Sequence, residues 1–178
     1  MAGEAGVSDV ASGVPEFVSL PKGIAVARRA ELHPSGIAQQ CSTTYPMLES
    51  HLKKSGAERD GPSYCIYYSF TPDHTRMELG IPFKISSPDK TVSDDPENDI
   101  IVVTPADVKA AAVWHIGPYQ KLGSAYKTLS EWIRSQGKSP GSLMFEEYYT
   151  AEACGAVGGG GEEEAVLGAG REAHVPAQ

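Results

Sequence analysis

The stretch HIGPYQKLGSAYKTLSEWIRSQGKSPGSLMFEEYYT, residues 115–150, decides the fold that we expect for this chain of 178 residues. Gly117 and Pro118 end an apolar strand and open a helix, because proline is well tolerated in a first helical turn. Apolar residues then recur at helical spacings of three and four, at Leu122, Ala125, Tyr126, Leu129, Trp132 and Ile133. The pattern predicts a helix over residues 119–136 and a strand in the aromatic run at 143–150.

An earlier copy of this stretch runs from Thr44 to Ser69 and aligns with it without a gap. Tyr45 matches Tyr126, which lies 81 positions later, and the aromatic residues of the two following strands match at the same offset. The pattern Glu-x-x-aliphatic-Pro also occurs twice, at residues 78–82 and 172–176. Each half therefore reads as strand, helix, strand, strand. A duplicated unit of this length indicates two half-domains that share one sheet or groove.

In combination these elements resemble the GyrI-like, or bacterial effector-binding, domain family, over roughly residues 15–176. The resemblance rests on four features: HIGPYQKLGSAYKTLSEWIRSQG at 115–137, FEEY at 145–148, YCIYY at 64–68 and the two Glu-x-x-aliphatic-Pro strands. It implies an α+β fold in which two pseudosymmetric βαββ half-domains form one antiparallel-sheet domain with a central ligand groove.

The expected domain spans residues 14–176 and follows a disordered lead at 1–13. Its halves cover about 14–85 and 100–176, and the acidic segment 86–99 links them. Residues 154–170, rich in glycine and glutamate, predict a flexible loop, and REAHVPAQ at 171–178 only loosely resembles the usual closing strand.

Within the first half we expect a strand over 17–32 that is interrupted at Pro21–Gly23, and further strands over 63–70 and 76–85. The helix of this half is expected over 44–55, with Thr43 or Thr44 as its N-cap. Pro46 sets that start, because proline fits a first turn and disrupts a helix interior.

The amino-acid composition indicates which classes of binding partner and which cellular compartment to expect. The formal net charge is −8, which disfavours direct contact with nucleic acid and favours neutral or cationic ligands. No apolar run is long enough to cross a membrane and no signal peptide is recognisable, so we expect a cytoplasmic protein. The three cysteines lack metal-ligand spacing and are expected as free thiols. We expect no cofactor and no metal.

Strand alternation selects the candidate ligand-binding residues. In the strand 63–70, the more apolar set is expected to pack under the first helix: Tyr64, Ile66, Tyr68 and Phe70. Cys65 and Tyr67 then face a groove on the side of the sheet that looks away from the helices. The offset of 81 puts Glu146 and Tyr148 on that same face. A carboxylate between tyrosines suits a lipophilic cation, because rings supply cation–π attraction and the carboxylate supplies charge.

The family resemblance points to Glu146 as well, since relatives carry the acidic group of their ligand pocket at this position. Trp114 and Tyr119 complete the candidate ligand-binding set, and Tyr119 could reach either the core or the groove. A register slip of one residue would instead turn Tyr64, Ile66, Phe145 and Glu147 inward.

Other residues receive structural interpretations. Glu147 is expected as an edge-exposed side chain, although relatives tend to carry an aliphatic residue there. Tyr126, Leu129 and Trp132 are expected in the core, and His115 is expected as a hydrogen-bonded structural residue.

The function that we expect is capture of an amphipathic aromatic or cationic small molecule in the groove between the halves. One alternative, taken from the resemblance, is a hydrolase of cyclopropane-bearing compounds, in which Glu146 and Tyr148 would activate water. A second alternative is a modulator that binds a protein partner such as gyrase. The sequence contains suitable residues for both binding and hydrolysis. We favour binding, because it requires only the pocket, whereas hydrolysis also requires a correctly placed water molecule.

Overall fold

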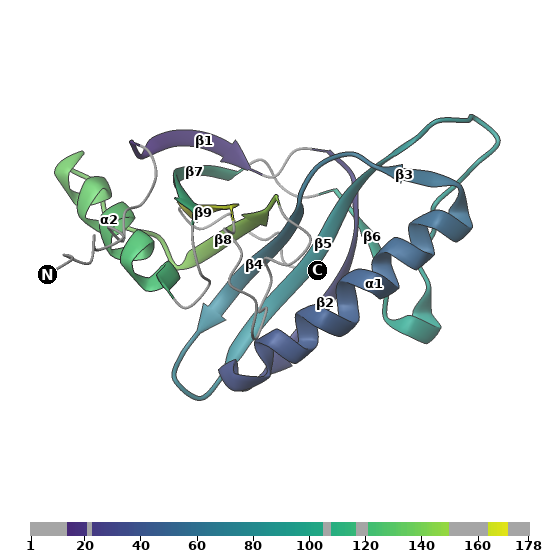
Figure 1. The fold of residues 1–178 in the computed structure, drawn as a ribbon, viewed down its shortest axis with the longest axis horizontal. Coiled ribbons are helices and arrows are strands. Elements are labelled where there is room, and N and C mark those ends of the chain that lie inside the picture. The colour runs from purple at the N-terminus through teal and green to yellow at the C-terminus, as the bar shows by residue number, and fades with distance from the viewer. Residues whose placement is uncertain (1–13, 21–22, 105–107, 117–120, 150–163, 171–178) are drawn as a thin grey trace, which may run out of the picture.

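The structure is a computed structural model that describes residues 14–20, 23–104, 108–116, 121–149 and 164–170 (Figure 1). Its first half contains, in chain order, β1 (Glu16–Leu20), β2 (Ala25–Leu32), α1 (Ile37–Ser55), β3 (Ala57–Arg59), β4 (Ser63–Phe70) and β5 (Thr75–Ile85). Its second half contains β6 (Ile101–Val103), β7 (Val108–Ile116), α2 (Leu122–Ser135), β8 (Leu143–Tyr148) and β9 (Glu164–Gly170). The predicted lead at 1–13 lies outside the described residues.

The strands form one antiparallel sheet in the order β1-β7-β9-β8-β4-β5-β2-β6, with β3 paired to β5. Strands β8 and β4 meet at its centre. Outward from that pair, the second half contributes β9 and then β7, and the first half contributes β5 and then β2. A short strand, β1 or β6, forms each edge of the sheet. The edge strands are exchanged, since β1 pairs with β7 of the second half and β6 pairs with β2 of the first. The predicted α+β fold with a large antiparallel sheet is confirmed.

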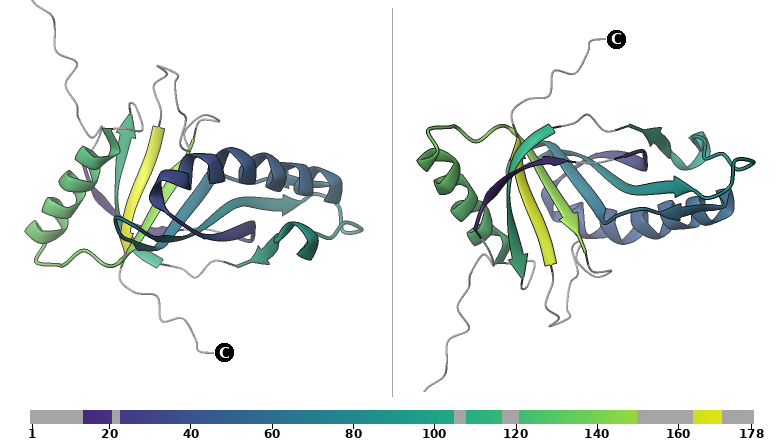
Figure 2. Two further views of the ribbon diagram at one scale, coloured as in Figure 1. Left: turned by 90° about the horizontal axis from the view of Figure 1, so that it is seen from below. Right: turned by 90° about the horizontal axis from the view of Figure 1, so that it is seen from above.

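The two helices pack on the same face of the sheet. Figure 2 shows α2 beside β7, whereas α1 runs along β5 and β2. Helix α2 buries the predicted stripe of Leu122, Ala125, Leu129 and Ile133. These residues share one apolar cluster with Ile37 and Cys41 of α1 and with the strand residues beneath both helices. The core of the molecule therefore joins the two halves.

Helix α1 begins at Ile37, seven residues before the predicted start, and Gly36 rather than a threonine is its N-cap. The buried side chains of the helix are Ile37, Cys41, Thr44, Leu48 and Leu52. Burial along this stripe stabilises the extra turns, although a proline inside a helix costs about 3 kcal/mol. Pro46 consequently lies inside the helix, and the prediction that it marks a first turn was wrong.

Helix α2 begins at Leu122, and residues 117–120 before it lie outside the described residues. It ends at Ser135, and Gly137 follows with a φ of 69°. This left-handed conformation is one that glycine adopts without steric cost, which explains why the helix stops there. The predicted C-terminal boundary is therefore close to the observed one.

The closing strand lies earlier than predicted. Residues 164–170 form β9, which pairs with β7 on one side and β8 on the other, although they were expected to be the end of a flexible loop. The reason is that β7 and β8 would otherwise present unpaired backbone groups in the middle of the sheet. Residues 171–178, where a closing strand had been sought, lie outside the described residues.

Among the helices that the structure describes, none is long and apolar enough to cross a membrane.

Candidate functional site

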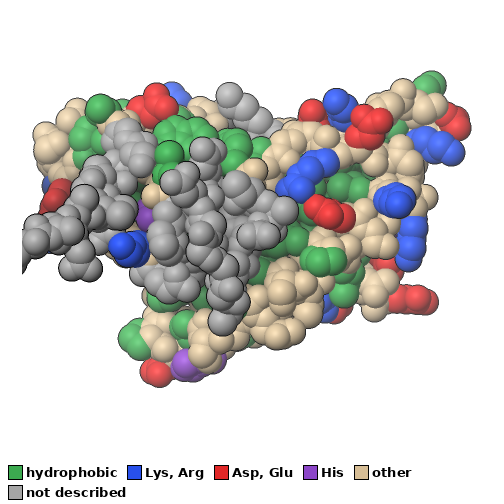
Figure 3. Space-filling view, viewed as in Figure 1, with side chains coloured by type: hydrophobic (Ala, Val, Ile, Leu, Met, Phe, Trp, Pro, Cys, Tyr) green, Lys and Arg blue, Asp and Glu red, His purple; other side chains and the backbone are tan. Residues whose placement is uncertain are grey.

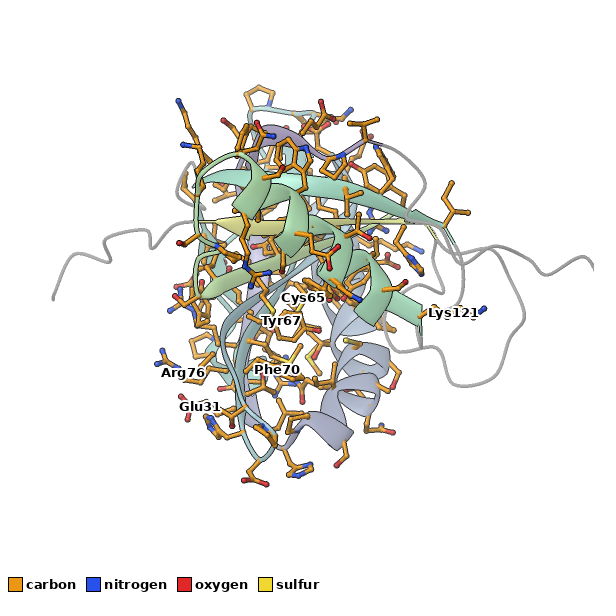
Figure 4. All side chains as sticks on the ribbon, turned by 90° about the vertical axis from the view of Figure 1, so that its left-hand side faces the viewer. Glu31, Cys65, Tyr67, Phe70, Arg76 and Lys121 are labelled. Atoms are coloured by element: carbon orange, nitrogen blue, oxygen red, sulfur yellow. The ribbon has the colours of Figure 1, made fainter. Side chains whose placement is uncertain are left out.

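Four of the predicted ligand-binding residues share one face of the sheet. Cys65 pairs directly with Glu146 across β4 and β8, and Tyr67 and Tyr148 follow on the same face. All four side chains are buried, and Glu146 is only 3% exposed. Figure 4 shows Cys65 and Tyr67 in the space between α2 and α1. The predicted grouping of these side chains therefore holds.

The side of the sheet on which they lie differs from the prediction. Cys65, Tyr67 and Tyr148 belong to the cluster that includes the buried stripes of both helices, so they face the helices. The alternate set, represented by Tyr64, Ile66 and Phe145, packs in a separate cluster on the opposite face. The central strand β4 is buried on both faces, so its polarity pattern gives no sign of which face the helices cover.

Three tyrosine hydroxyls converge on the carboxylate of Glu146. Tyr126 of α2 donates to Oε1 at 2.6 Å, and Tyr67 of β4 donates to Oε2 at 3.5 Å. Tyr148, two residues further along β8, also donates to Oε2. The carboxylate is thus held from the helix, from its own strand and from the neighbouring strand.

Burial raises the pKa of Glu146, and the hydrogen bonds from the three tyrosines act against that rise. Burial also raises the pKa of Tyr148 well above its ordinary value, and the charge of Glu146 raises it further. Tyr148 therefore keeps its proton and remains a donor. The site is a desolvated carboxyl group held by three phenol donors, and among the described residues no lysine or arginine forms an ion pair with it.

Tyr126 was predicted to be a core residue, and the structure assigns its hydroxyl to Glu146. The signal that could have found it is the internal repeat, which matches Tyr126 with Tyr45 at the start of the first copy. Tyr45 lies on the same side of the sheet, donates to the backbone oxygen of Tyr64 at 2.7 Å and meets the ring of Tyr148 edge-on at 6.3 Å. Tyrosine at both repeat positions marks the sheet face beneath the helices.

His115 also lies on the helix side of the sheet, two strands from Glu146. It is buried, and its proximity lowers the pKa of Glu146. Its strand β7 pairs with β9, which in turn pairs with β8. Sequence reasoning had placed His115 in a purely structural role, because a histidine before a turn offers no clue to a carboxylate on a distant strand.

Phe70 reaches the helix side of the sheet through an irregularity in β4. The pairing with β5 shifts between Tyr67 and Ser69, and such a bulge changes which residues face a given side. Phe70 consequently meets the ring of Tyr67 edge-on at 5.9 Å instead of packing with Tyr64. Half of its surface is exposed, and Figure 4 shows it at the helix side of the sheet.

Two predicted ligand-binding residues are not brought to this cluster. Trp114 alternates with His115 on β7 and faces the opposite side of the sheet, where it contacts the ring of Tyr149. Trp114 therefore lies apart from Glu146, because successive side chains of a strand point to opposite faces of the sheet. Tyr119 lies outside the described residues. Glu147 is likewise on the opposite face, where it accepts a hydrogen bond from Tyr149.

A second buried carboxylate, Glu78 of β5, lies on that opposite face. It accepts hydrogen bonds from Tyr64 at 3.1 Å and Tyr68 at 3.2 Å, and it forms an ion pair with Arg29 at 2.9 Å. Arg29 neutralises Glu78, whereas among the described residues no lysine or arginine forms an ion pair with Glu146. The two carboxylates are almost equally buried, but among the described residues only that of Glu78 forms an ion pair with an arginine.

The described residues contain no group of three or more His, Cys, Asp or Glu side chains arranged to hold a metal ion. Cys65 is a free, buried thiol whose pKa burial raises well above its ordinary value, so it is a poor nucleophile and a weakly polar lining residue. Cys41 of α1 is disulfide-bonded, which corrects the expectation that all three cysteines are free.

Comparison with known proteins places these residues in a wider context. A family model described as the GyrI-like small molecule binding domain matches residues 14–155. No curated protein matches the chain by sequence.

Solved structures match the fold at low sequence identity. The EcmrR C-terminal domain is 15% identical with a TM-score of 0.69, over 88% of this chain and 96% of that one. EcmrR in a complex with DNA is 16% identical with a TM-score of 0.66, over 88% of this chain and 56% of that one, so the present chain spans little more than half of that protein. A hydrolase from Listeria innocua is 11% identical with a TM-score of 0.56, over 87% and 90% of the two chains.

Proposed function

The chain belongs to the GyrI-like small molecule binding domain family, and we propose that it binds an amphipathic aromatic cation in the groove between α1 and α2. Glu146 is the charge partner of that cation in this proposal. Tyr67, Tyr148 and the thiol of Cys65 line the floor, and Tyr126 and Tyr45 line the helix walls.

The observation that carries the proposal is the contrast between the two buried carboxylates. Glu78 has Arg29 as an ion-pair partner, while Glu146 accepts three phenol hydrogen bonds. His115 also lowers the pKa of Glu146, but by less than each of these hydrogen bonds. A buried carboxylate is costly unless a positive charge compensates it. A cationic ligand would recover that cost at Glu146, and Arg29 already does so at Glu78.

The walls of the groove suit a flat apolar ligand body. Phe70 is half exposed and contacts Tyr67, which in turn donates to Glu146. A chain of aromatic rings therefore leads from the solvent toward the carboxylate. Aromatic faces supply both contact area and attraction for a cation. Because the ring and the charge act together, the groove favours a cationic aromatic compound over either property alone.

A hydrolase that acts on cyclopropane-bearing compounds would use the same carboxylate as a general base. Such a base needs a free lone pair directed at water. Three phenol donors already engage the oxygens of Glu146, which leaves about one of the roughly four lone-pair sites of a carboxylate for a base, so we favour binding over hydrolysis. Contact with DNA is a feature of the EcmrR complex and forms no part of the proposal for this chain.

Glu146→Gln tests the proposal, because glutamine keeps the shape of the side chain and removes its charge. Affinity for a cationic dye should fall by about 1.5–3 kcal/mol, the usual worth of a hydrogen bond to a charged group. Affinity for a neutral dye of the same outline should be nearly unchanged. Equal losses for both dyes would show that Glu146 shapes the groove without acting as a charge partner.

The same variant separates binding from hydrolysis. If Glu146 is a general base, the variant should bind a cyclopropane substrate normally and hydrolyse it more slowly, by a factor on the order of 10²–10⁴. Recovery of the intact compound from the parent protein would exclude hydrolysis of that compound and leave the binding proposal in place.

A further inference from the structure

A cavity of about 460 Å³ lies on the sheet face opposite to Glu146. Strands β1, β5, β7 and β8 and the segment leading into β4 supply its described lining, which includes Val18, Pro62, Trp114, Glu147 and Tyr149. Figure 3 shows hydrophobic side chains gathered where β1 crosses the molecule. The volume lies within the range of small-molecule sites. Val113 borders both this cavity and the apolar cluster beneath the helices, but Glu146 and its three phenol donors are not among the described lining residues.

Two aromatic rings form one side of this cavity. Trp114 and Tyr149 lie with ring centroids 5.0 Å apart and planes inclined at 49°. Both are unusually exposed for large aromatic side chains, at 37% and 47%. Inclined rings whose faces remain accessible form an open corner, and a cation near both faces would be attracted by both quadrupoles.

The charge of the lining has one sign. Glu16, Asp60 and Glu147 contribute carboxylates, and the described lining contains no lysine or arginine. Asp60 lies 3.9 Å from Lys84, but that pair is exposed on both sides and is worth little in water. The described lining therefore places carboxylates beside an aromatic corner.

A hydrogen bond joins the ring of Tyr149 to the carboxylate of Glu147. The hydroxyl of Tyr149 donates to Oε2 of Glu147 at 3.0 Å. Burial, together with the charge of Glu147, raises the pKa of Tyr149 to about 12. The phenol thus keeps its proton at neutral pH, and the negative charge stays on the carboxylate beside the ring.

We propose that this cavity, the Trp114 cavity, is a second ligand site that binds small alkylammonium cations. Trp114 and Tyr149 would contact the cation through their ring faces, and Glu147 would supply the nearest charge. Val18 and Pro62 would contact the alkyl groups. The Trp114 cavity is separated from Glu146 by the sheet, so the two sites bind independently.

Choline and 3,3-dimethylbutan-1-ol form a matched pair of probes, because they share one outline and differ in charge. The chain contains two tryptophans, and their indole N–H signals in an NMR spectrum report the two sides separately. Trp132 packs on Phe17 at α2 and serves as the internal control. We expect choline to shift the Trp114 signal with a Kd at or below about 10 mM, while the Trp132 signal and the alcohol titration stay unchanged.

Three variants assign the contributions. Trp114→Leu should weaken choline binding about 3- to 10-fold, as loss of a cation–π contact predicts. Calorimetry would measure choline binding to this variant, because the variant lacks the Trp114 NMR signal. Glu147→Gln should weaken it to a similar extent. Tyr149→Phe keeps the ring and should bind nearly as well as the parent. Thermal unfolding of each variant checks that the fold is intact.

Glu146→Gln distinguishes this site from the groove, because the Trp114 shift should persist in that variant even if groove binding is lost. A Trp114 signal that responds equally to choline and to the alcohol would overturn the proposal. So would the absence of a saturable shift up to about 10 mM, or a shift that disappears in the Glu146 variant.

Discussion

Tyr126 of α2 donates a 2.6 Å hydrogen bond to the carboxylate of Glu146 on β8. This contact joins a helix to the sheet at a buried charge. It depends on two residues 20 positions apart, one on α2 and one on β8, that meet between the helix and the sheet. The site is therefore as sensitive to the placement of α2 as to the register of β8.

Tyr126→Phe should reduce the free energy of unfolding by about 1.5–3 kcal/mol, because it removes a hydrogen bond to a charged group. Tyr45→Phe is the matched control, since Tyr45 donates to a neutral backbone carbonyl and its loss should cost about 0.5–1.5 kcal/mol. Chemical denaturation measures both. Equal losses would mean that the carboxyl group of Glu146 is protonated under the conditions of the assay.

The stability difference between the parent and Glu146→Gln should depend on pH. Burial raises the pKa of Glu146 above its ordinary 4.5 in the folded state, so the folded protein binds the proton more tightly than the unfolded chain. Stability from that proton is fully present below pH 4.5 and is lost as pH rises through the folded pKa. Relative to the variant, the parent should lose at most about 1.4 kcal/mol per pH unit. A parent that gains on the variant with rising pH would contradict the raised pKa.

Arg29→Met should destabilise the protein, because it leaves the buried carboxylate of Glu78 with phenol partners alone. The side chain of Arg29 is 64% exposed, so the loss should lie below the roughly 3–5 kcal/mol known for fully buried pairs. The double variant Arg29→Met/Glu78→Gln should recover part of the loss. A double-mutant cycle by urea unfolding measures the coupling, and a coupling near zero would show that solvent screens the pair.

Gly80→Ala should destabilise the sheet by about 1–3 kcal/mol or more, because a Cβ there would lie 2.2 Å from Cζ of Tyr64. The ring of Tyr64 has little room to move, since it is buried and stacked on Phe145. Gly123→Ala in α2 is the control, as nothing lies within 4 Å of its Cβ position. That variant should gain up to about 1 kcal/mol from helix propensity. Thermal unfolding of both variants measures these changes. A Gly80→Ala variant as stable as Gly123→Ala would contradict the prediction.

Local patterns in the sequence specified most of the elements. The stripe from Leu122 to Ile133 predicted the buried face of α2, and the aromatic run 143–150 predicted β8 almost to the residue. Helical spacing and aromatic content can be read from residues that lie close together in the sequence. These two elements could therefore be predicted without the tertiary structure. The start of α1 was missed because burial at Ile37 and Cys41 outweighs the local signal of Pro46.

By itself, the sequence determined that Cys65, Tyr67, Glu146 and Tyr148 share one face, because side chains alternate along a strand and the repeat links two strands. Only the tertiary structure decided that this face lies beneath the helices, and that Trp114 lies on the other. The physical reason is that β4 buries both of its faces, so that its polarity pattern is the same toward either side. Packing of α1 and α2 chose between the two faces. That choice brought Tyr126 to Glu146 and left Arg29 with Glu78.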